Sequence, residues 1–143
     1  MAGYSGTPLV QKLGIKPGMR IGIRRAPARF AELLVPWPAR AEVTTPATGP
    51  LDLLMVFVER AADLERDFPR GAESLTPAGM LWVAWPKRAS GVPTDLTEDR
   101  VRTIGLAAGL VDVKVCAVTE VWSGLKFVRR LADRPKAAGG AEG

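Results

Sequence analysis

The side chains best suited to bind a ligand are five cations that follow three separate apolar segments of the chain. These cations are Arg24, Arg25, Arg60, Lys87 and Arg88. If the three segments are parallel strands, their carboxyl ends meet at one edge of a sheet, which is where such sheets bind ligands. Guanidinium groups bind phosphate and carboxylate in bidentate geometry. The spacing therefore suggests an anion-binding edge, although solvated strand ends would have the same composition.

A polar loop follows the third apolar segment and adds groups that could line a pocket. The residues of this predicted pocket are Trp85, Ser90, Thr94, Asp95 and Trp122. Asp95 could act as a base or pair with Lys87 or Arg88. A structural role is equally open, because Thr94–Asp99 has the composition of a helix cap and tryptophans commonly pack in a core.

The composition excludes several kinds of active site. Histidine is absent and Cys116 is the only cysteine, so no histidine-based triad, imidazole base or zinc site can form. Ser90 has no histidine to activate it, and Lys87-x-x-Ser90 reverses the order of a serine–lysine motif. The sequence contains no phosphate-cradling glycine loop. We therefore assign no catalytic residue and no metal ligand.

The charge and the apolar pattern narrow the range of partners. The formal net charge of +5 permits an anionic ligand or an acidic protein surface. A nucleic-acid surface needs a basic stripe with interleaved aromatic residues, and none is visible. No apolar run approaches the ~20 residues of a membrane span, and Met1–Val10 has no secretory pattern. We expect a cytoplasmic protein, since the lone Cys116 cannot form an internal disulfide.

Two apolar runs are expected to form the centre of the sheet that positions these residues. Leu51–Val58 and Met80–Trp85 are apolar on both faces, which is typical of central strands in a parallel sheet covered on both sides. Met19–Ile23 alternates with polar residues and predicts a first strand. Arg40–Thr44 predicts a weak edge strand. This pattern indicates an α/β fold in which the two apolar strands are adjacent and parallel.

Helices are predicted between these strands from their start and stop signals. They are a helix between Pro8 and Gly14, a short helix over Ala28–Leu34, a helix over Ala61–Leu75 that Pro69 kinks or divides, and a helix that Thr97 caps and Gly109 ends. Thr76–Gly79 is expected to form the turn into the third strand.

The C-terminal part predicts an antiparallel hairpin. In its first strand, one face would carry Val111, Val113, Val115 and Ala117, and the other face would carry Asp112, Lys114 and Cys116. Leu125–Arg130 would form the second strand. We thus expect a single α/β domain over residues 1–132. Residues 133–143 are rich in alanine, glycine and charge, and predict a flexible tail.

Two segments of the chain resemble the C-terminal half of a class I methyltransferase. Leu75–Trp85 is similar to the turn and strand that follow the fourth helix of such enzymes, and Ala108–Arg130 is similar to their final helix end and hairpin. The resemblance implies a Rossmann-like, mostly parallel sheet closed by an antiparallel hairpin. It carries fold information only.

The first strand departs from the methyltransferase pattern. Those enzymes follow it with closely spaced glycines that let S-adenosylmethionine approach the backbone, whereas here Arg24–Pro27 occupies the turn. No acidic residue suited to the ribose follows the second strand, and Glu42 is poorly placed for that role. We therefore expect no tight binding of S-adenosylmethionine and assign no cofactor.

A second resemblance extends over residues 3–131. Its matches are Tyr4–Gly14, Leu81–Asp99 and Val111–Val128. They are similar to a bacterial family that is known only as a domain of unknown function, which implies no activity. Our preferred interpretation is a non-catalytic binding or regulatory module for an anionic small molecule or an acidic protein surface. One alternative is a reduced methyltransferase-like enzyme, and another is a structural protein that docks through Val35–Pro38.

Overall fold

The computed structural model describes residues 7–44 and 49–133 of the chain. In chain order, with η for a 3₁₀ helix, its elements are α1 (Leu9–Leu13), β1 (Arg20–Arg24), η1 (Phe30–Leu33), β2 (Glu42–Val43), β3 (Leu51–Phe57), α2 (Ala61–Glu73), β4 (Leu75–Pro86), η2 (Arg88–Ser90), α3 (Glu98–Ala107), β5 (Leu110–Ala117), β6 (Trp122–Arg129) and η3 (Leu131–Asp133). Apart from Asp133, the predicted flexible tail lies outside the described residues.

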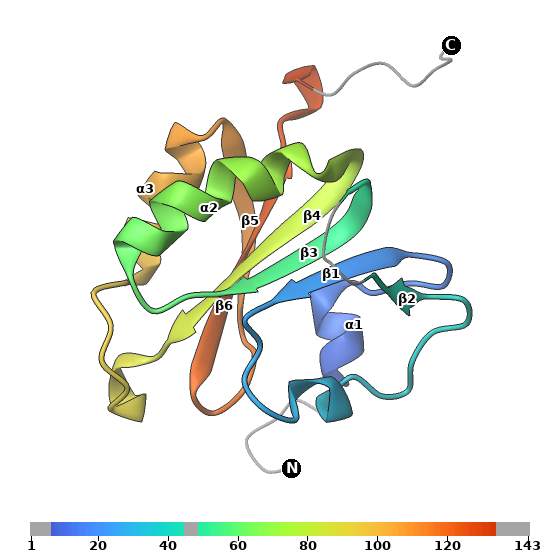
Figure 1. The fold of residues 1–143 in the computed structure, drawn as a ribbon, viewed down its shortest axis with the longest axis horizontal. Helices are drawn as coiled ribbons and strands as arrows, with labels where there is room; N and C mark the ends of the chain where they lie inside the picture. The colour runs from blue at the N-terminus through green and yellow to red at the C-terminus, as the bar shows by residue number, and fades with distance from the viewer. Residues whose placement is uncertain (1–6, 45–48, 134–143) are drawn as a thin grey trace.

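The strands form one sheet in the order β2-β1-β3-β4-β6-β5 (Figure 1). The strands β2, β1, β3 and β4 are parallel to one another, β6 is antiparallel to β4, and β5 is antiparallel to β6. This Rossmann-like sheet confirms the predicted α/β fold, its central parallel pair and its closing hairpin. In the sheet, the strand that follows β1 in the chain, β2, lies on one side of β1. The strand that follows β3, which is β4, lies toward the opposite edge of the sheet. The order therefore reverses between β1 and β3, the place where open α/β sheets form a ligand crevice.

Both faces of the central β3–β4 pair are buried. The side chains that alternate along these strands form two apolar layers. The layer under α2 and α3 contains Leu54, Val56, Leu81, Val83 and Trp85, and the layer under α1 and η1 contains Leu53, Met55, Phe57, Trp82 and Ala84. None of these ten side chains is more than 5% exposed. This burial explains why both strands are apolar without alternation.

The short helix α1 is held by a side chain of the central strand. Trp82 is fully buried, and its Nε1 donates a hydrogen bond to the carbonyl oxygen of Leu13 at 2.9 Å. This contact satisfies both the indole and a carbonyl at the end of α1. Gly14 then ends the helix with a φ of 85°, as its sequence position predicts. Five residues are too few for a stable isolated helix, so α1 depends on this packing.

The helices α2 and α3 pack on the hairpin through Phe127. Its ring makes an edge-to-face contact with Phe68 of α2, with ring centroids 5.0 Å apart. On the α3 side, a Cβ at Gly105 would lie 2.1 Å from the Phe127 ring. Glycine at position 105 is therefore required for the close approach of α3 to β6.

The predicted turn at Thr76–Gly79 is wrong, and one of the two alternatives for Pro69 is excluded. Thr76–Gly79 is part of β4, which begins at Leu75 and pairs irregularly with β3 between Leu51 and Leu53. Pro69 lies inside one continuous helix, α2, rather than dividing it in two. Between Leu75 and Met80, β4 contains more residues than the segment of β3 that it pairs with, and the two strands pair on both sides of this irregularity. Turn-forming residues in the sequence do not distinguish such an irregularity from a turn.

The faces of β5 also differ from the prediction, because a bulge at Val113 interrupts the alternation. Asp112 pairs with Phe127 and Lys114 pairs with Lys126, so Val113 has no partner in the register. Val115 therefore lies on the same side of the sheet as Asp112, and Lys114 and Cys116 lie on the side of α1. Val113 is 53% exposed.

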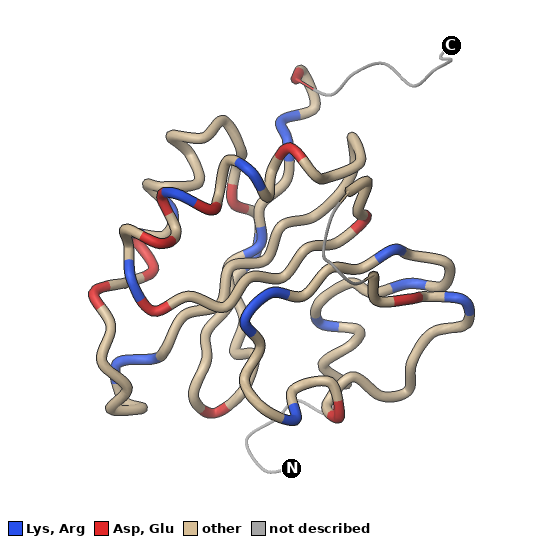
Figure 2. Tube along the Cα trace, viewed as in Figure 1, with Lys and Arg blue, Asp and Glu red and all other residues tan. Residues whose placement is uncertain are grey.

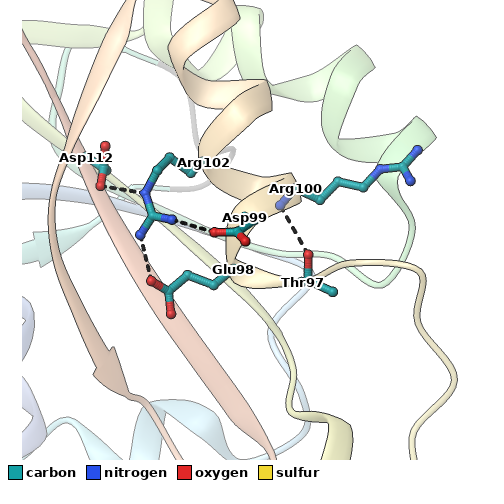
Figure 3. Close-up of polar contacts among 6 residues, drawn as sticks. All are labelled: Thr97, Glu98, Asp99, Arg100, Arg102 and Asp112. Carbon is teal, nitrogen blue, oxygen red and sulfur yellow. Dashed lines mark hydrogen bonds and ion pairs between the residues drawn. The ribbon is translucent and has the colours of Figure 1, made fainter.

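An ion-pair network joins α3 to β5 (Figure 3). The Arg102 guanidinium donates to Asp112 through Nε at 2.8 Å, to Asp99 at 3.0 Å and to Glu98 at 2.6 Å. The hydrogen bond from Arg102 lowers the pKa of Asp112. At the start of the same helix, Thr97 accepts a hydrogen bond from the Arg100 backbone, which confirms the predicted cap.

Substitution of Val83 by aspartate tests the burial of the central strands. Val83 is fully buried, so Val83→Asp should prevent folding, because an unpaired buried carboxylate costs several kcal/mol. Val113→Asp makes the same change at the exposed bulge and should leave the thermal transition near that of the wild type. Circular dichroism during heating measures both. A cooperative transition in Val83→Asp would contradict the burial.

The Asp112–Arg102 pair should make stability depend on pH. Because the pKa of Asp112 is lower in the folded state, its contribution is present above the ordinary carboxyl pKa of about 4 and is lost as pH falls through the folded-state pKa. Asp112→Asn should therefore lower the unfolding temperature at pH 7 but have little effect near pH 2. Asp99→Asn removes a far more exposed partner of Arg102 and should have a smaller effect. An equal loss at both pH values would refute the assignment.

Candidate functional site

The predicted cations follow β1, β3 and β4 at the carboxyl edge of the parallel strands. Figure 2 shows basic segments at the ends of all three strands, with acidic segments between them. The register places Arg24 of β1 level with Val56 of β3, and Phe57 level with Ala84 of β4. The three strands therefore end on the same side, as the sequence predicted, but the cations are distributed along the edge.

One of these cations already has an internal partner. Arg25 forms an ion pair with Asp67 of α2 at 2.8 Å and has a left-handed φ of 61°. The pair ties the turn after β1 to the helix after β3, across the reversal in strand order. Arg24 is half-buried at the end of β1. Arg25 is exposed, as Arg60 and Arg88 are, but it is held by this ion pair.

The loop after β4 is tied to the end of β3 by two predicted pocket residues. Asp95 Oδ1 accepts a hydrogen bond from the backbone nitrogen of Ala61, at 2.8 Å, and so fills the N-terminus of α2. Thr94 Oγ1 donates to the carbonyl oxygen of Glu59 at 2.6 Å and accepts from Leu96. A helix N-terminus attracts anions, and here the anion comes from the chain itself. These contacts support the capping interpretation of this segment.

Ser90 closes the turn at η2. Its Oγ donates to the carbonyl oxygen of Lys87 at 2.6 Å and accepts from the backbone of Val92. The hydroxyl therefore serves the local turn.

A cavity of about 430 Å³ lies inside this loop. It is lined by Arg88 and residues 91–97, which include Thr94 and Asp95. Thr94 binds the backbone of Glu59, and Asp95 binds the backbone of Ala61. Arg60 lies between these two residues in the chain. The cavity thus brings together Arg88, Thr94 and Asp95, and the backbone on either side of Arg60 is bound by Thr94 and Asp95.

The two tryptophans of the predicted pocket lie on opposite faces of the sheet. Trp85 is 5% exposed and packs in the layer under α2 and α3. Trp122 packs on the other layer, where its ring contacts Phe57 edge-to-face at a centroid distance of 5.1 Å. They cannot flank one pocket.

A second cavity adjoins Trp122 and was not anticipated. It has a volume of about 390 Å³ and is lined by Pro27, Ala28, Arg29, Phe30, Glu32, Leu33, Thr119, Val121 and Trp122. The segment around η1 gave only a weak helical pattern, and its approach to the β5–β6 turn is a long-range contact. The adjacent Val35–Pro38 segment is mostly exposed, with Val35 at 61% and Trp37 at 38%.

Two kinds of site are not found within residues 7–44 and 49–133. His, Cys, Asp and Glu side chains do not gather there in a group of three or more that could hold a metal. Within the same residues, each helix is too short or too polar to cross a membrane.

Solved structures of low sequence identity share this fold. A possible exported protein from Bordetella parapertussis has a TM-score of 0.60 at 12% identity, over 85% of this chain and 65% of its own. A SAM-dependent methyltransferase from Aquifex aeolicus has a TM-score of 0.59 at 14% identity, over 83% and 86%. Aeropyrum pernix fibrillarin with natively bound S-adenosyl-L-methionine has a TM-score of 0.56 at 15% identity, over 88% and 70%.

These likenesses show a methyltransferase-like fold. Sequence identities this low give no information about activity. This chain spans just under two thirds of the Bordetella protein. No protein-family model matches the chain, and no curated protein does. Membership of the uncharacterised bacterial family therefore stays a prediction.

The residues at the strand ends do not fit the S-adenosylmethionine that this fold implies. The turn after β1 carries the Arg25 side chain, which is ion-paired with Asp67. The rings of Phe30 and Trp122 both pack edge-to-face on Phe57, at the end of β3. Glu42 begins β2 instead of following its carboxyl end. The side chains at these strand ends thus contact one another and do not present the glycine turn and the ribose carboxylate of the methyltransferase pattern.

Calorimetry with S-adenosylmethionine tests this conclusion. We expect no saturable heat at millimolar cofactor, because Arg24–Pro27 replaces the glycines of the turn after β1 and Arg25 is ion-paired with Asp67. A thermal melt of the same sample serves as the control for folding. A dissociation constant in the micromolar range, about −8 kcal/mol, would contradict the conclusion.

Proposed function

We propose that the protein is a non-catalytic binding module that recognises a small anion at the cavity inside the β4–α3 loop. The observation that carries this proposal is the position of Arg88, which lines the cavity at the carboxyl edge of the sheet. Arg60 follows the neighbouring strand and is exposed next to the contacts of Thr94 and Asp95. The Arg88 guanidinium at this cavity suits a phosphate or a carboxylate.

The polar groups around the cavity support binding rather than catalysis. Asp95 is hydrogen-bonded to the α2 backbone, Thr94 to Glu59, and Ser90 to its own turn. A general base must be within reach of a substrate proton, whereas these groups serve the backbone. The chain also lacks histidine. The chemistry that remains is charge recognition by the arginines.

The fold gives a second candidate, a reduced methyltransferase-like enzyme that uses S-adenosylmethionine. The observation in its favour is the likeness of the whole sheet to SAM-dependent methyltransferases. The closed turn after β1 weighs against it. Cofactor calorimetry separates the two candidates, because only the enzyme requires tight binding of S-adenosylmethionine.

A titration with inorganic pyrophosphate tests the anion proposal. Binding should change the chemical shifts of the backbone amides in residues 88–97 and should weaken with added salt. Arg88→Ala should weaken it about tenfold or more, because a hydrogen bond to a charged group contributes roughly 1.5–3 kcal/mol. Its unfolding temperature should hardly change, since Arg88 is exposed.

Arg70→Ala is the matched control, because it removes the same charge from the exposed surface near the end of α2. It should bind pyrophosphate like the wild type. Equal affinity of Arg88→Ala and the wild type would refute the proposed site, as would binding that is insensitive to salt.

A further inference from the structure

Four lysines come together on the sheet face that α1 covers, and we call them the lysine cluster. They are Lys12, Lys16, Lys114 and Lys126. They belong to α1, to the segment after it, and to both strands of the β5–β6 hairpin. Sequence positions 12–16 and 114–126 are far apart, so only the tertiary structure assembles the cluster.

The hairpin places two of these lysines directly opposite each other. Lys114 of β5 pairs with Lys126 of β6, and Lys126 pairs in turn with Trp82 of β4, which lies in the layer under α1. Lys114 Nζ also donates to the carbonyl oxygen of Lys12 at 3.2 Å, which joins the hairpin to α1. Like charges directly opposite on neighbouring strands destabilise a sheet. The arrangement is therefore unfavourable for the protein alone.

Three lysines of the cluster form no ion pair with a carboxylate among the described residues. The ion pairs there involve neither Lys16 nor Lys114 nor Lys126. The nearest carboxylate on β5, Asp112, lies on the opposite face and is held by Arg102. Partial burial, Lys114 and Lys16 together lower the pKa of Lys126. The carboxyl edge differs, because Arg25 has Asp67 there.

We propose that the lysine cluster is a binding site for a phosphate-bearing small molecule. A phosphate or pyrophosphate group concentrates several negative charges in a small volume, so it can offset several ammonium groups at once. Ammonium groups act as point charges with rotatable donors and do not need the planar geometry that arginine imposes. The site lies on a different surface from the Arg88 cavity and does not depend on the proposed function.

Cys116 provides a readout that is local to this cluster. It is the only cysteine of the chain, is half-buried, and lies on the α1 side of β5, two residues beyond Lys114. Burial raises the pKa of its thiol, whereas Lys114 and Lys12 act in the opposite direction. A bound phosphate would cancel the effect of the lysines and disfavour the thiolate, which is the reactive form.

The experiment measures the rate of Cys116 alkylation by iodoacetamide as a function of pH, with inorganic pyrophosphate or with sodium chloride of equal ionic strength. Pyrophosphate should raise the apparent pKa of the thiol and slow alkylation at pH 8 about three- to tenfold, with saturation. Lys126→Gln and Lys114→Gln should each reduce this effect. Arg88→Ala should retain it, which separates this site from the proposed function.

Thermal unfolding of the same variants controls for folding. Without pyrophosphate, Lys126→Gln should unfold at the same temperature as the wild type or higher, because it removes repulsion from Lys114. Pyrophosphate should raise the unfolding temperature of Arg88→Ala more than that of the double variant Arg88→Ala/Lys126→Gln. The proposal is overturned if alkylation does not respond to pyrophosphate, if Lys126→Gln responds like the wild type, or if Lys126→Gln alone is destabilised.

Discussion

Burial of both faces of the β3–β4 pair is the constraint on which the rest of this fold depends. Two adjacent strands with apolar side chains on both sides must be covered by separate layers. The helices α2 and α3 form one layer, and α1 with η1 forms a thinner one. The thin layer is secured by the buried hydrogen bond from Trp82 to Leu13. In the thick layer, the Phe127 ring packs against Phe68 of α2. Because Gly105 has no side chain, α3 can also pack closely against this ring.

The same constraint determines how the polar groups at the strand ends are used. Once β3 and β4 are buried, the backbone groups at the start of α2 need partners, and the loop after β4 supplies Asp95 and Thr94. Those side chains are hydrogen-bonded to the backbone around the start of α2. Arg60 and Arg88 are exposed at the same edge.

The likeness to methyltransferases concerns the fold alone. The sheet order reverses between β1 and β3, where an open α/β sheet has its crevice. In this chain an ion pair between Arg25 and Asp67 bridges that place. Phe57, Phe30 and Trp122 pack together beside it. The architecture is thus shared, while the side chains at its crevice contact one another.

The sequence by itself determined the elements whose signals are local. Continuous apolar runs identified β3 and the core of β4, Thr97 marked the start of α3, and Gly14 marked the end of α1. It also brought the cations to one edge, because parallel strands that end in cations must place them on the same side.

Only the tertiary structure decided which side chains meet. A single extra residue at Val113 moves Lys114 and Cys116 onto one face and Asp112 onto the other, and alternation alone cannot locate such a bulge. Trp85 and Trp122 are separated by the thickness of the sheet although both lie near the same strand ends. The partner of Asp95 is 34 residues away in the chain. Such contacts depend on register and packing between distant segments, which no local pattern of residues encodes.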